Sequence, residues 1–135
     1  MSDTTIIFTV LAVAVFVFFV LQNRPALDFG DETYTGKARY IIDGDTLYIN
    51  GHKPAIRLWG VDAPEKNESG HNAATATLKK LAQGKKLTCR KIAIDRYGRT
   101  VARCFLPNGQ EINAAMIASG TASEYRRYTK GFYSR

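Results

Sequence analysis

The chain has 135 residues and a formal net charge of +7 at pH 7, so it has room for about one globular domain. The positive charge is concentrated after residue 36, where 18 Lys and Arg face 8 Asp and Glu. This balance excludes an acidic, self-repelling chain and favours an anionic partner, either nucleic acid or an anionic membrane surface. The sequence shows no internal repeat and no low-complexity tract.

The first predicted element is an apolar helix at residues 4–23. These residues contain no charged side chain, and the stretch 6–21 is apolar at every position except Thr9. At about 1.5 Å per residue, a helix of this length spans about 30 Å, the thickness of a hydrocarbon core. We therefore predict that residues 1–23 are an uncleaved transmembrane anchor. A cleaved signal peptide is the alternative, but no basic residue precedes the apolar run.

A polar segment at residues 24–36, interrupted by Pro25 and Gly30, is predicted to be a juxtamembrane linker. Basic residues follow the apolar helix and none precedes it, which favours a cytoplasmic domain under the positive-inside rule.

The remaining residues, 37–135, predict an α+β domain that is mainly β. Strands are expected at residues 37–42, 46–50, 55–59, 87–94 and 100–106, with helices at 69–84 and 111–119. Asn50-Gly51 suggests a hairpin turn. Ser69 or Asn72 is expected to cap the start of the first of these helices, and Gly84 and Gly120 are expected to end the two helices. Five strands with inserted helices fit an OB-fold barrel, a scaffold often used to bind nucleic acid.

Two cysteines flank the second predicted hairpin. Cys89 and Cys104 lie almost symmetrically about the turn at residues 95–98, so they would face each other on paired strands, where a disulfide fits. Two buried, reduced thiols are the alternative. A persistent disulfide requires an oxidising compartment, so a disulfide opposes the cytoplasmic orientation.

Charged residues of both signs gather in one turn after the third predicted strand. Arg57, Asp62 and Glu65 lie within nine residues, and Asp45 lies in the turn before. Carboxylates on constrained turns can hold a hard cation, and an arginine beside a cation suggests a phosphate between them. Each residue alone fits an ordinary surface turn. Together with Arg99, they predict hydrolysis of a phosphodiester, which requires an activated water and stabilised negative charge.

Three motifs resemble those of the staphylococcal nuclease-like (thermonuclease) domains. They are Ile-Asp-Gly-Asp-Thr at 42–46, Arg-Leu-Trp-Gly-Val-Asp-Ala-Pro-Glu at 57–65 and Asp-Arg-Tyr-Gly-Arg at 95–99, in the family's order. The resemblance covers roughly residues 37–130. It implies a five-stranded OB barrel with helices and hydrolysis of DNA or RNA with little sequence preference.

The resemblance also implies the roles of individual residues. Asp45 and Asp62 would bind Ca²⁺ together with the main-chain carbonyl of Ala63. The implied catalytic residues are Glu65, as general base or water orienter, and the phosphate-binding Arg57 and Arg99. Nucleotide contacts are expected from Arg96, Tyr97, Tyr125 and Tyr128.

The resulting hypothesis is a membrane-anchored, Ca²⁺-dependent nuclease. Its alternative is a catalytically weak nucleic-acid-binding module tethered at the membrane, and no protein partner is expected. Because an unspecific nuclease endangers the cell's own nucleic acids, we expect the domain to lie outside the cytoplasm. The sequence departs from its relatives in a shorter connection after Glu65 and in its end at Arg135, where relatives usually continue into another helix.

Overall fold

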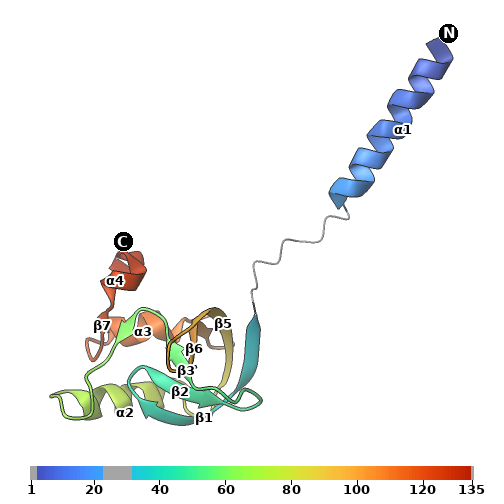
Figure 1. Ribbon diagram of the computed structural model, residues 1–135. Coiled ribbons are helices and arrows are strands. Elements are labelled where there is room, and N and C mark those ends of the chain that lie inside the picture. The colour runs from blue at the N-terminus through green and yellow to red at the C-terminus, as the bar shows by residue number, and fades with distance from the viewer. Residues whose placement is uncertain (1–2, 23–31, 135) are drawn as a thin grey trace. The chain divides into compact units, whose positions relative to one another are not determined.

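The computed structural model describes residues 3–22 and 32–134, and the chain divides into two compact units, residues 1–30 and 31–135. The first unit contains the helix α1 (Asp3–Gln22) (Figure 1). No helix in these described ranges is long and apolar enough to cross a membrane. The predicted transmembrane helix is therefore not supported. The apolar stretch of α1 runs from Ile6 to Leu21 with Thr9 as a polar position within it, whereas a span takes about 20 apolar residues.

The second unit is built on a closed β-barrel, which confirms the predicted five-stranded architecture (Figure 1). Its strands are β1 (Thr33–Asp43), β2 (Thr46–Ile49), β3 (Ile56–Leu58), β5 (Lys86–Ile94) and β6 (Thr100–Phe105). They are hydrogen-bonded in the order β1, β2, β3, β6, β5, and β1 also pairs with β5, which closes the barrel. The β3 and β6 strands run parallel, and the other pairs are antiparallel.

Alternation of side chains explains why these segments form a barrel. Along β6, every second residue is buried, so one face of the strand points into the core. In β2, Leu47 and Ile49 are buried on either side of the half-buried Tyr48, and Thr46 is buried as well. Fully buried side chains from several strands and helices fill the interior, among them Leu47, Ile49, Ile56, Leu58, Leu78, Leu87, Ile112 and Met116. Burying a side chain of this size contributes about 1.5 to 3 kcal/mol, so the apolar positions suffice to specify the inner face.

The barrel begins earlier than the sequence suggests. The first strand starts at Thr33, and residues 33–36 of the predicted linker pair with residues 87–90 of β5. The other part of that linker, residues 24–31, lies outside the described residues. A Cβ on Gly36 would lie 2.1 Å from the carbonyl oxygen of Asn50, so this position requires glycine. The connection from β2 to β3 is longer than a two-residue hairpin, because strand pairing resumes only at Ile56.

Both predicted helices are present. The helix α2 (His71–Ala82) ends before Gly84, whose φ is +78°, and α3 (Ile112–Ala118) ends before Gly120, whose φ is +76°. The predicted caps of α2 are wrong. The N-cap is Gly70 in a left-handed conformation with no side-chain cap, because the preceding turn approaches the helix with positive φ.

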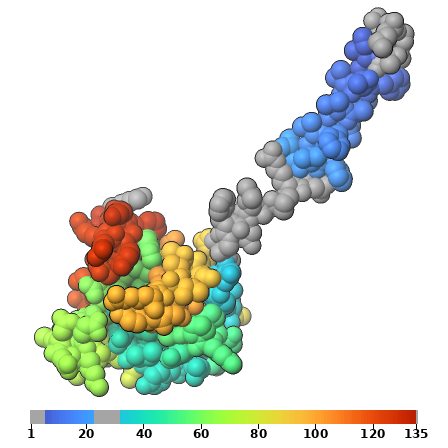
Figure 2. All heavy atoms as spheres, in the orientation of Figure 1, coloured from blue at the N-terminus to red at the C-terminus, as the bar shows by residue number. Residues whose placement is uncertain are grey.

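The C-terminal segment adds a small second sheet that the sequence does not predict. The two-residue strands β4 (Val61–Asp62) and β7 (Ser123–Glu124) pair antiparallel, followed by α4 (Arg126–Thr129) and the 3₁₀ helix η1 (Phe132–Ser134). The rings of Phe132 and Tyr133 lie 5.6 and 5.7 Å from that of Trp59. In Figure 2 the atoms of this segment, coloured red, form a compact group at one end of the second unit, next to green atoms.

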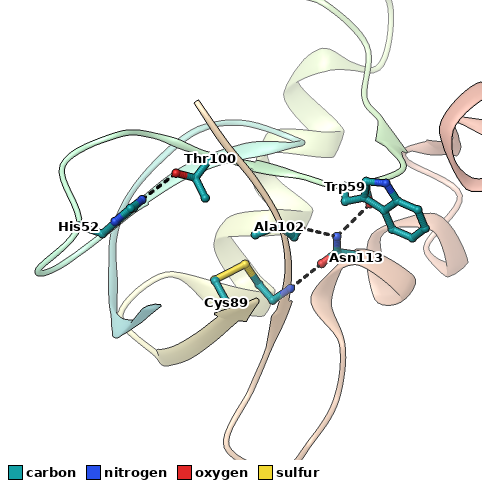
Figure 3. Close-up of a disulfide and its surroundings, with 7 residues drawn as sticks. His52, Trp59, Cys89, Thr100, Ala102 and Asn113 are labelled. Atoms are coloured by element: carbon teal, nitrogen blue, oxygen red, sulfur yellow. Dashed lines mark hydrogen bonds between the residues drawn. A yellow bond between two sulfur atoms is a disulfide. The ribbon is translucent and has the colours of Figure 1, made fainter. Parts of the chain in front are cut away.

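A disulfide and a buried asparagine join β5, β6 and α3. Cys89 and Cys104 are directly paired across β5 and β6, as the hairpin symmetry predicts, and they form a disulfide, one of the two alternatives that the sequence leaves open. Beside it, the amide of Asn113 accepts from Cys104 N at 3.0 Å and donates to the carbonyls of Ala102 and Trp59 at 3.1 and 2.9 Å (Figure 3). The strand end at Trp59 is thus held against the barrel.

Candidate nuclease site

The candidate site is centred on Asp45, in the turn between β1 and β2. Its side chain is 9% exposed and lies 3.3 Å from Arg57 Nη2 through Oδ2. The same oxygen accepts a hydrogen bond from Ala63 N at 3.1 Å, and Oδ1 accepts one from the Thr46 hydroxyl at 3.0 Å. The structure therefore brings three of the predicted site residues, Asp45, Arg57 and Ala63, into direct contact.

The carboxyl group of Asp45 is electrostatically unusual. Burial raises its pKa to about 6, although the Arg57 guanidinium opposes the rise, and nearby Asp43 adds to it. Burial destabilises the ionised form of a carboxyl group, and a neighbouring acidic group destabilises it further. The single Arg57 guanidinium does not fully offset these two effects.

Arg57 is fixed in its orientation by main-chain acceptors. Its Nη1 donates to the carbonyls of Leu58 at 2.8 Å and Val61 at 2.6 Å, while Nη2 faces Asp45. The Arg57 side chain is 17% exposed, so it reaches the surface while most of it stays packed against the protein. A guanidinium held this way keeps its position when negative charge develops nearby, which is what electrostatic stabilisation of a transition state requires.

The remaining carboxylates lie beside this cluster. Asp62 is exposed on β4, next to Ala63, and lines a groove of about 470 Å³ between the segments 62–73 and 120–123. Glu65 is exposed in the following turn, where its main-chain N–H donates to Glu68 Oε1 at 2.9 Å. The predicted base therefore lies close in sequence to the groove and is accessible to water.

The donor atoms of this region suit a hard cation. Asp45 and Asp62 carry carboxylate oxygens, and the hydrogen bond from Ala63 N to Asp45 joins the two segments that carry the predicted ligands. Residues 3–22 and 32–134 contain no group of three or more Asp, Glu, His or Cys side chains placed to hold a metal ion. A bound Ca²⁺ would thus depend on two carboxylates, a carbonyl oxygen and water, which is compatible with its flexible coordination.

The turn from β5 to β6 carries a second group of predicted residues. Asp95 Oδ2 accepts from Arg99 Nε at 2.7 Å, and Oδ1 accepts from the main-chain N–H groups of Tyr97 and Arg99. Burial alone would raise the pKa of Asp95, but these hydrogen bonds outweigh it and lower the pKa. The Tyr97 ring is 68% exposed, with the guanidinium groups of Arg96 and Arg99 at 4.9 and 5.3 Å from its centre.

Strand register places Arg57 and Arg99 on one face of the barrel. Arg57 pairs with Val101 across β3 and β6, and Arg99 lies two residues before Val101. Side chains two residues apart on a strand point to the same side. The alternate positions are buried inside the barrel: Ile56, Leu58, Thr100 and Ala102. Both arginines therefore lie on the outer face, where one phosphate can approach them.

Tyr125 and Tyr128 lie together in the C-terminal segment, with ring centres 4.8 Å apart and nearly perpendicular. Tyr125 N donates to the Gly60 carbonyl at 2.8 Å, so the pair is tied to the end of β3. The Tyr128 ring is 60% exposed. These contacts join the two tyrosines to each other and to Gly60, and their role with nucleotide stays a prediction.

Sequence reasoning missed two polar side chains that support the site. Asn113 is fully buried and braces Trp59, two residues after Arg57. His52 lies 2.8 Å from the Thr100 hydroxyl, next to Arg99 (Figure 3). Burial lowers the pKa of His52. The only local signal for Asn113 is one amide within an otherwise apolar helix face, which does not indicate its partners.

Comparisons with known proteins support this interpretation. Residues 55–135 match the model of the family described as staphylococcal nuclease homologue. The chain is 35% identical over 95 residues to an uncharacterized endonuclease of Escherichia coli O157:H7, covering 69% of this chain and 62% of that protein. It is 33% identical over 107 residues to a micrococcal nuclease of Shigella flexneri, covering 72% and 62%.

A more distant match is to the endonuclease YhcR of Bacillus subtilis, 29% identical over 123 residues, which are 78% of this chain and 10% of that protein. The chain spans about three fifths of the length of the first two relatives. The matched region includes β3, the turn with Asp62 and Glu65, and the turn with Arg99, which carry most of the predicted site. The chain belongs to the staphylococcal nuclease homologue family.

Proposed function

We propose that this chain is a Ca²⁺-dependent nuclease that hydrolyses phosphodiester bonds of DNA or RNA with little sequence preference. The observation that carries the proposal is the contact of Asp45 with both Arg57 and Ala63 on the outer face that also bears Arg99. It joins carboxylate oxygens and fixed guanidinium groups, the two kinds of group that phosphodiester hydrolysis requires.

The residues divide the chemistry between them. Arg57 and Arg99 bind the non-bridging oxygens of the scissile phosphate and stabilise the negative charge that grows in the transition state. Glu65 orients or deprotonates the attacking water. Asp45, Asp62 and the Ala63 carbonyl would hold Ca²⁺, which supplies Lewis-acid polarisation of a phosphate oxygen when bound.

The experiment is an activity assay of the full chain in mild detergent on single-stranded DNA, double-stranded DNA and RNA. Ca²⁺ is titrated, excess chelator is the negative control, and Glu65→Gln is the catalytic variant. Turnover that requires both Ca²⁺ and Glu65 supports the nuclease. Salt-sensitive binding of nucleic acid without turnover at any Ca²⁺ concentration would instead support a binding module.

We also propose that the domain works outside the cytoplasm. The disulfide between Cys89 and Cys104 supports this location, because reducing systems in the cytosol keep most thiols free. The test is to trap free thiols with a maleimide in intact cells before lysis. Labelling of both cysteines in the trapped protein would contradict the proposal.

A further inference from the structure

A groove of about 210 Å³ lies on the barrel surface apart from the Asp45 cluster, and the proposed catalytic residues do not account for it. It is lined by Trp59, Arg90, Lys91, Ile92, Arg103 and Phe132, and we call it the basic-aromatic groove. We propose that the basic-aromatic groove binds a base and the adjoining phosphates of single-stranded nucleic acid next to the cleavage site. This inference rests on the proposed function, since it names the form of substrate that the same site takes.

The aromatic wall suits stacking. The ring centres of Trp59 and Phe132 lie 5.6 Å apart at an interplanar angle of 66°, and Phe132 is 37% exposed. Pockets that enclose drug-sized ligands measure roughly 300 to 1,000 Å³, so this smaller space suits one base whose sugar and phosphate stay outside. Because every base has a flat π-face, such a wall binds nucleic acid without reading its sequence.

The aromatic wall is held in place by the fold. Trp59 N donates to the Ala102 carbonyl at 2.8 Å, and the Trp59 carbonyl accepts from Asn113 at 2.9 Å. In Figure 3 the indole of Trp59 points away from Asn113 and the disulfide. A stacking ring on such a braced backbone loses little conformational freedom on binding, which favours affinity.

The cationic side chains of the groove can bind phosphate groups. Arg90 and Arg103 face each other across β5 and β6, and Arg90 is exposed. Arg103 pairs with Glu111 through its guanidinium Nε, and the guanidinium also lies 4.8 Å from the centre of the Phe132 ring, so its positive charge borders the aromatic wall. Lys91 lies 3.2 Å from Glu32 in a partly exposed pair. Exposed pairs contribute little to stability, so a phosphate can replace Glu32.

The groove lies on the same outer face of the barrel as the two arginines of the candidate nuclease site. Trp59 lies two residues after Arg57, and its hydrogen bond to Ala102 continues the pairing of β3 with β6. Arg103 lies in β6, four residues after Arg99, which immediately precedes that strand. Even-numbered steps keep side chains on one face of a strand, so all four lie on the outer face. At about 3.3 Å per residue, the groove lies roughly 7 to 13 Å beyond the two arginines. One strand of a few nucleotides can reach both.

Stacking on Trp59 requires an unpaired base, so the groove predicts tighter binding of single-stranded than of double-stranded DNA. Trp59 is the only tryptophan of the chain, which makes its fluorescence a direct probe of the groove. The experiment titrates the full chain, in mild detergent and excess chelator, with a ten-nucleotide oligothymidine and with its duplex. A fluorescent label on the oligonucleotide reports total binding independently.

We expect saturable quenching of Trp59 by the single strand and weaker quenching by the duplex. Phe132→Leu should raise the Kd at least about fivefold, since stacking is lost. Arg90→Gln should raise the Kd about threefold or more and lower the salt slope by about 1. The matched control is Lys79→Gln, which removes the same charge from the exposed face of α2. It should change the Kd less than twofold.

Binding reported by the labelled oligonucleotide without any change in Trp59 emission would overturn the inference. Equal effects of Arg90→Gln and Lys79→Gln would overturn it as well, since only overall charge would matter. Absence of oligonucleotide binding is a third contradicting outcome. The Ca²⁺-dependent turnover assay tests the proposed nuclease independently of this binding experiment. Quenching of Trp59 without turnover would contradict the nuclease and support binding in the groove. Turnover without quenching would support the nuclease and contradict binding in the groove. Far-UV circular dichroism of each variant confirms that it is folded.

Discussion

The carboxylate of Asp45 and the main-chain nitrogen of Ala63 form a 3.1 Å hydrogen bond that joins residues 18 positions apart. The bond ties the turn between β1 and β2 to the segment that carries Asp62, so the two predicted calcium ligands come from elements that are held together. Asp45 therefore has a structural role besides its predicted role as a calcium ligand, whereas the side chain of Asp62 is exposed.

Asp45→Ala and Asp62→Ala are therefore expected to differ in stability but not in activity. Loss of several kcal/mol of charge stabilisation corresponds to at least about a 100-fold drop in Ca²⁺-dependent turnover for both. Asp45→Ala also leaves Arg57 and Ala63 N without a partner, which costs about 1 to 3 kcal/mol. Because the variant removes a carboxyl group whose pKa is raised to about 6, this loss of stability should be largest near pH 4 and smaller above pH 6. Asp62→Ala should stay within about 0.5 kcal/mol. Turnover rates and urea unfolding check this, and an active Asp62→Ala enzyme would contradict the assigned ligand.

Arg99→Lys tests the fixed guanidinium of the β5–β6 turn. A lysine keeps the charge but loses the planar fork that Asp95 orients, so we expect kcat to fall about 100- to 1,000-fold. Arg39→Lys is the matched control, because Arg39 is exposed on β1 and lies 5.0 Å from the Tyr48 ring. Steady-state kinetics should show wild-type kcat for the control. Equal kcat in both variants would remove Arg99 from the catalytic set.

Reduction of the disulfide should destabilise the barrel. Cys89 and Cys104 are separated by 15 residues, and closing a loop of about this length stabilises a fold by about 3 kcal/mol. Urea unfolding with and without reductant measures the difference. The double variant Cys89→Ser, Cys104→Ser should have a similar deficit and no response to reductant. A wild-type protein that is equally insensitive would show that the bond is not formed in solution.

Gly60 is a close-contact position whose substitution should loosen the C-terminal segment. Its φ is +73°, and a Cβ there would lie 2.3 Å from Thr129 Cγ2. Gly109 has a φ of +88° with nothing near its Cβ position, so Gly109→Ala isolates the backbone strain alone. We expect Gly60→Ala to lower the free energy of unfolding by about 1 to 3 kcal/mol more than Gly109→Ala does, because the Thr129 side chain must move away from the new Cβ. Urea unfolding of the two variants measures this, and equal losses would argue against the contact.

Acid should release the same segment through Glu124. Hydrogen bonds from the hydroxyls of Ser134 and Thr129 lower the pKa of this carboxyl, burial opposes them, and the N–H of Tyr133 adds to the lowering. The stabilisation is therefore complete above the ordinary pKa of 4.5 and is lost as pH falls through the lowered value.

Trp59 emission between pH 7 and pH 2.5 follows this release, because the rings of Phe132 and Tyr133 leave the indole. Glu124→Gln should show altered emission already at neutral pH and a flatter acid response. An acid response identical to that of the wild type would assign the transition to another carboxyl group.

Much of the barrel is readable from local sequence pattern. Burial alternates along residues 100–105, and residues 46–49 are rich in β-forming side chains, so both segments are recognisable as strands. Gly84 and Gly120, which have positive φ, lie where the helices stop. The charged turns that carry Asp45, Arg57 and Asp62 were likewise visible as a departure from that pattern. Such a pattern depends only on residues close together in the sequence, so it can be recognised without the tertiary structure.

The errors arise where distant residues decide the outcome. Thr33–Gly36 form a strand only because β5 offers an edge, and β4 and β7 are too short to show any alternation. The apolar run at residues 6–21 predicted a membrane helix, which the helix α1 of the described residues does not support. In each case the local composition was compatible with more than one structure.

By itself, the sequence determined the five strands, the inner face of the barrel and the residue types that phosphodiester chemistry needs. Only the tertiary structure decided that Asp45 contacts Arg57 and Ala63, that Asn113 braces Trp59 and that Phe132 returns to form the basic-aromatic groove. Strand periodicity is set by backbone geometry within a few residues, whereas these contacts depend on how long connections bring remote segments together around one core.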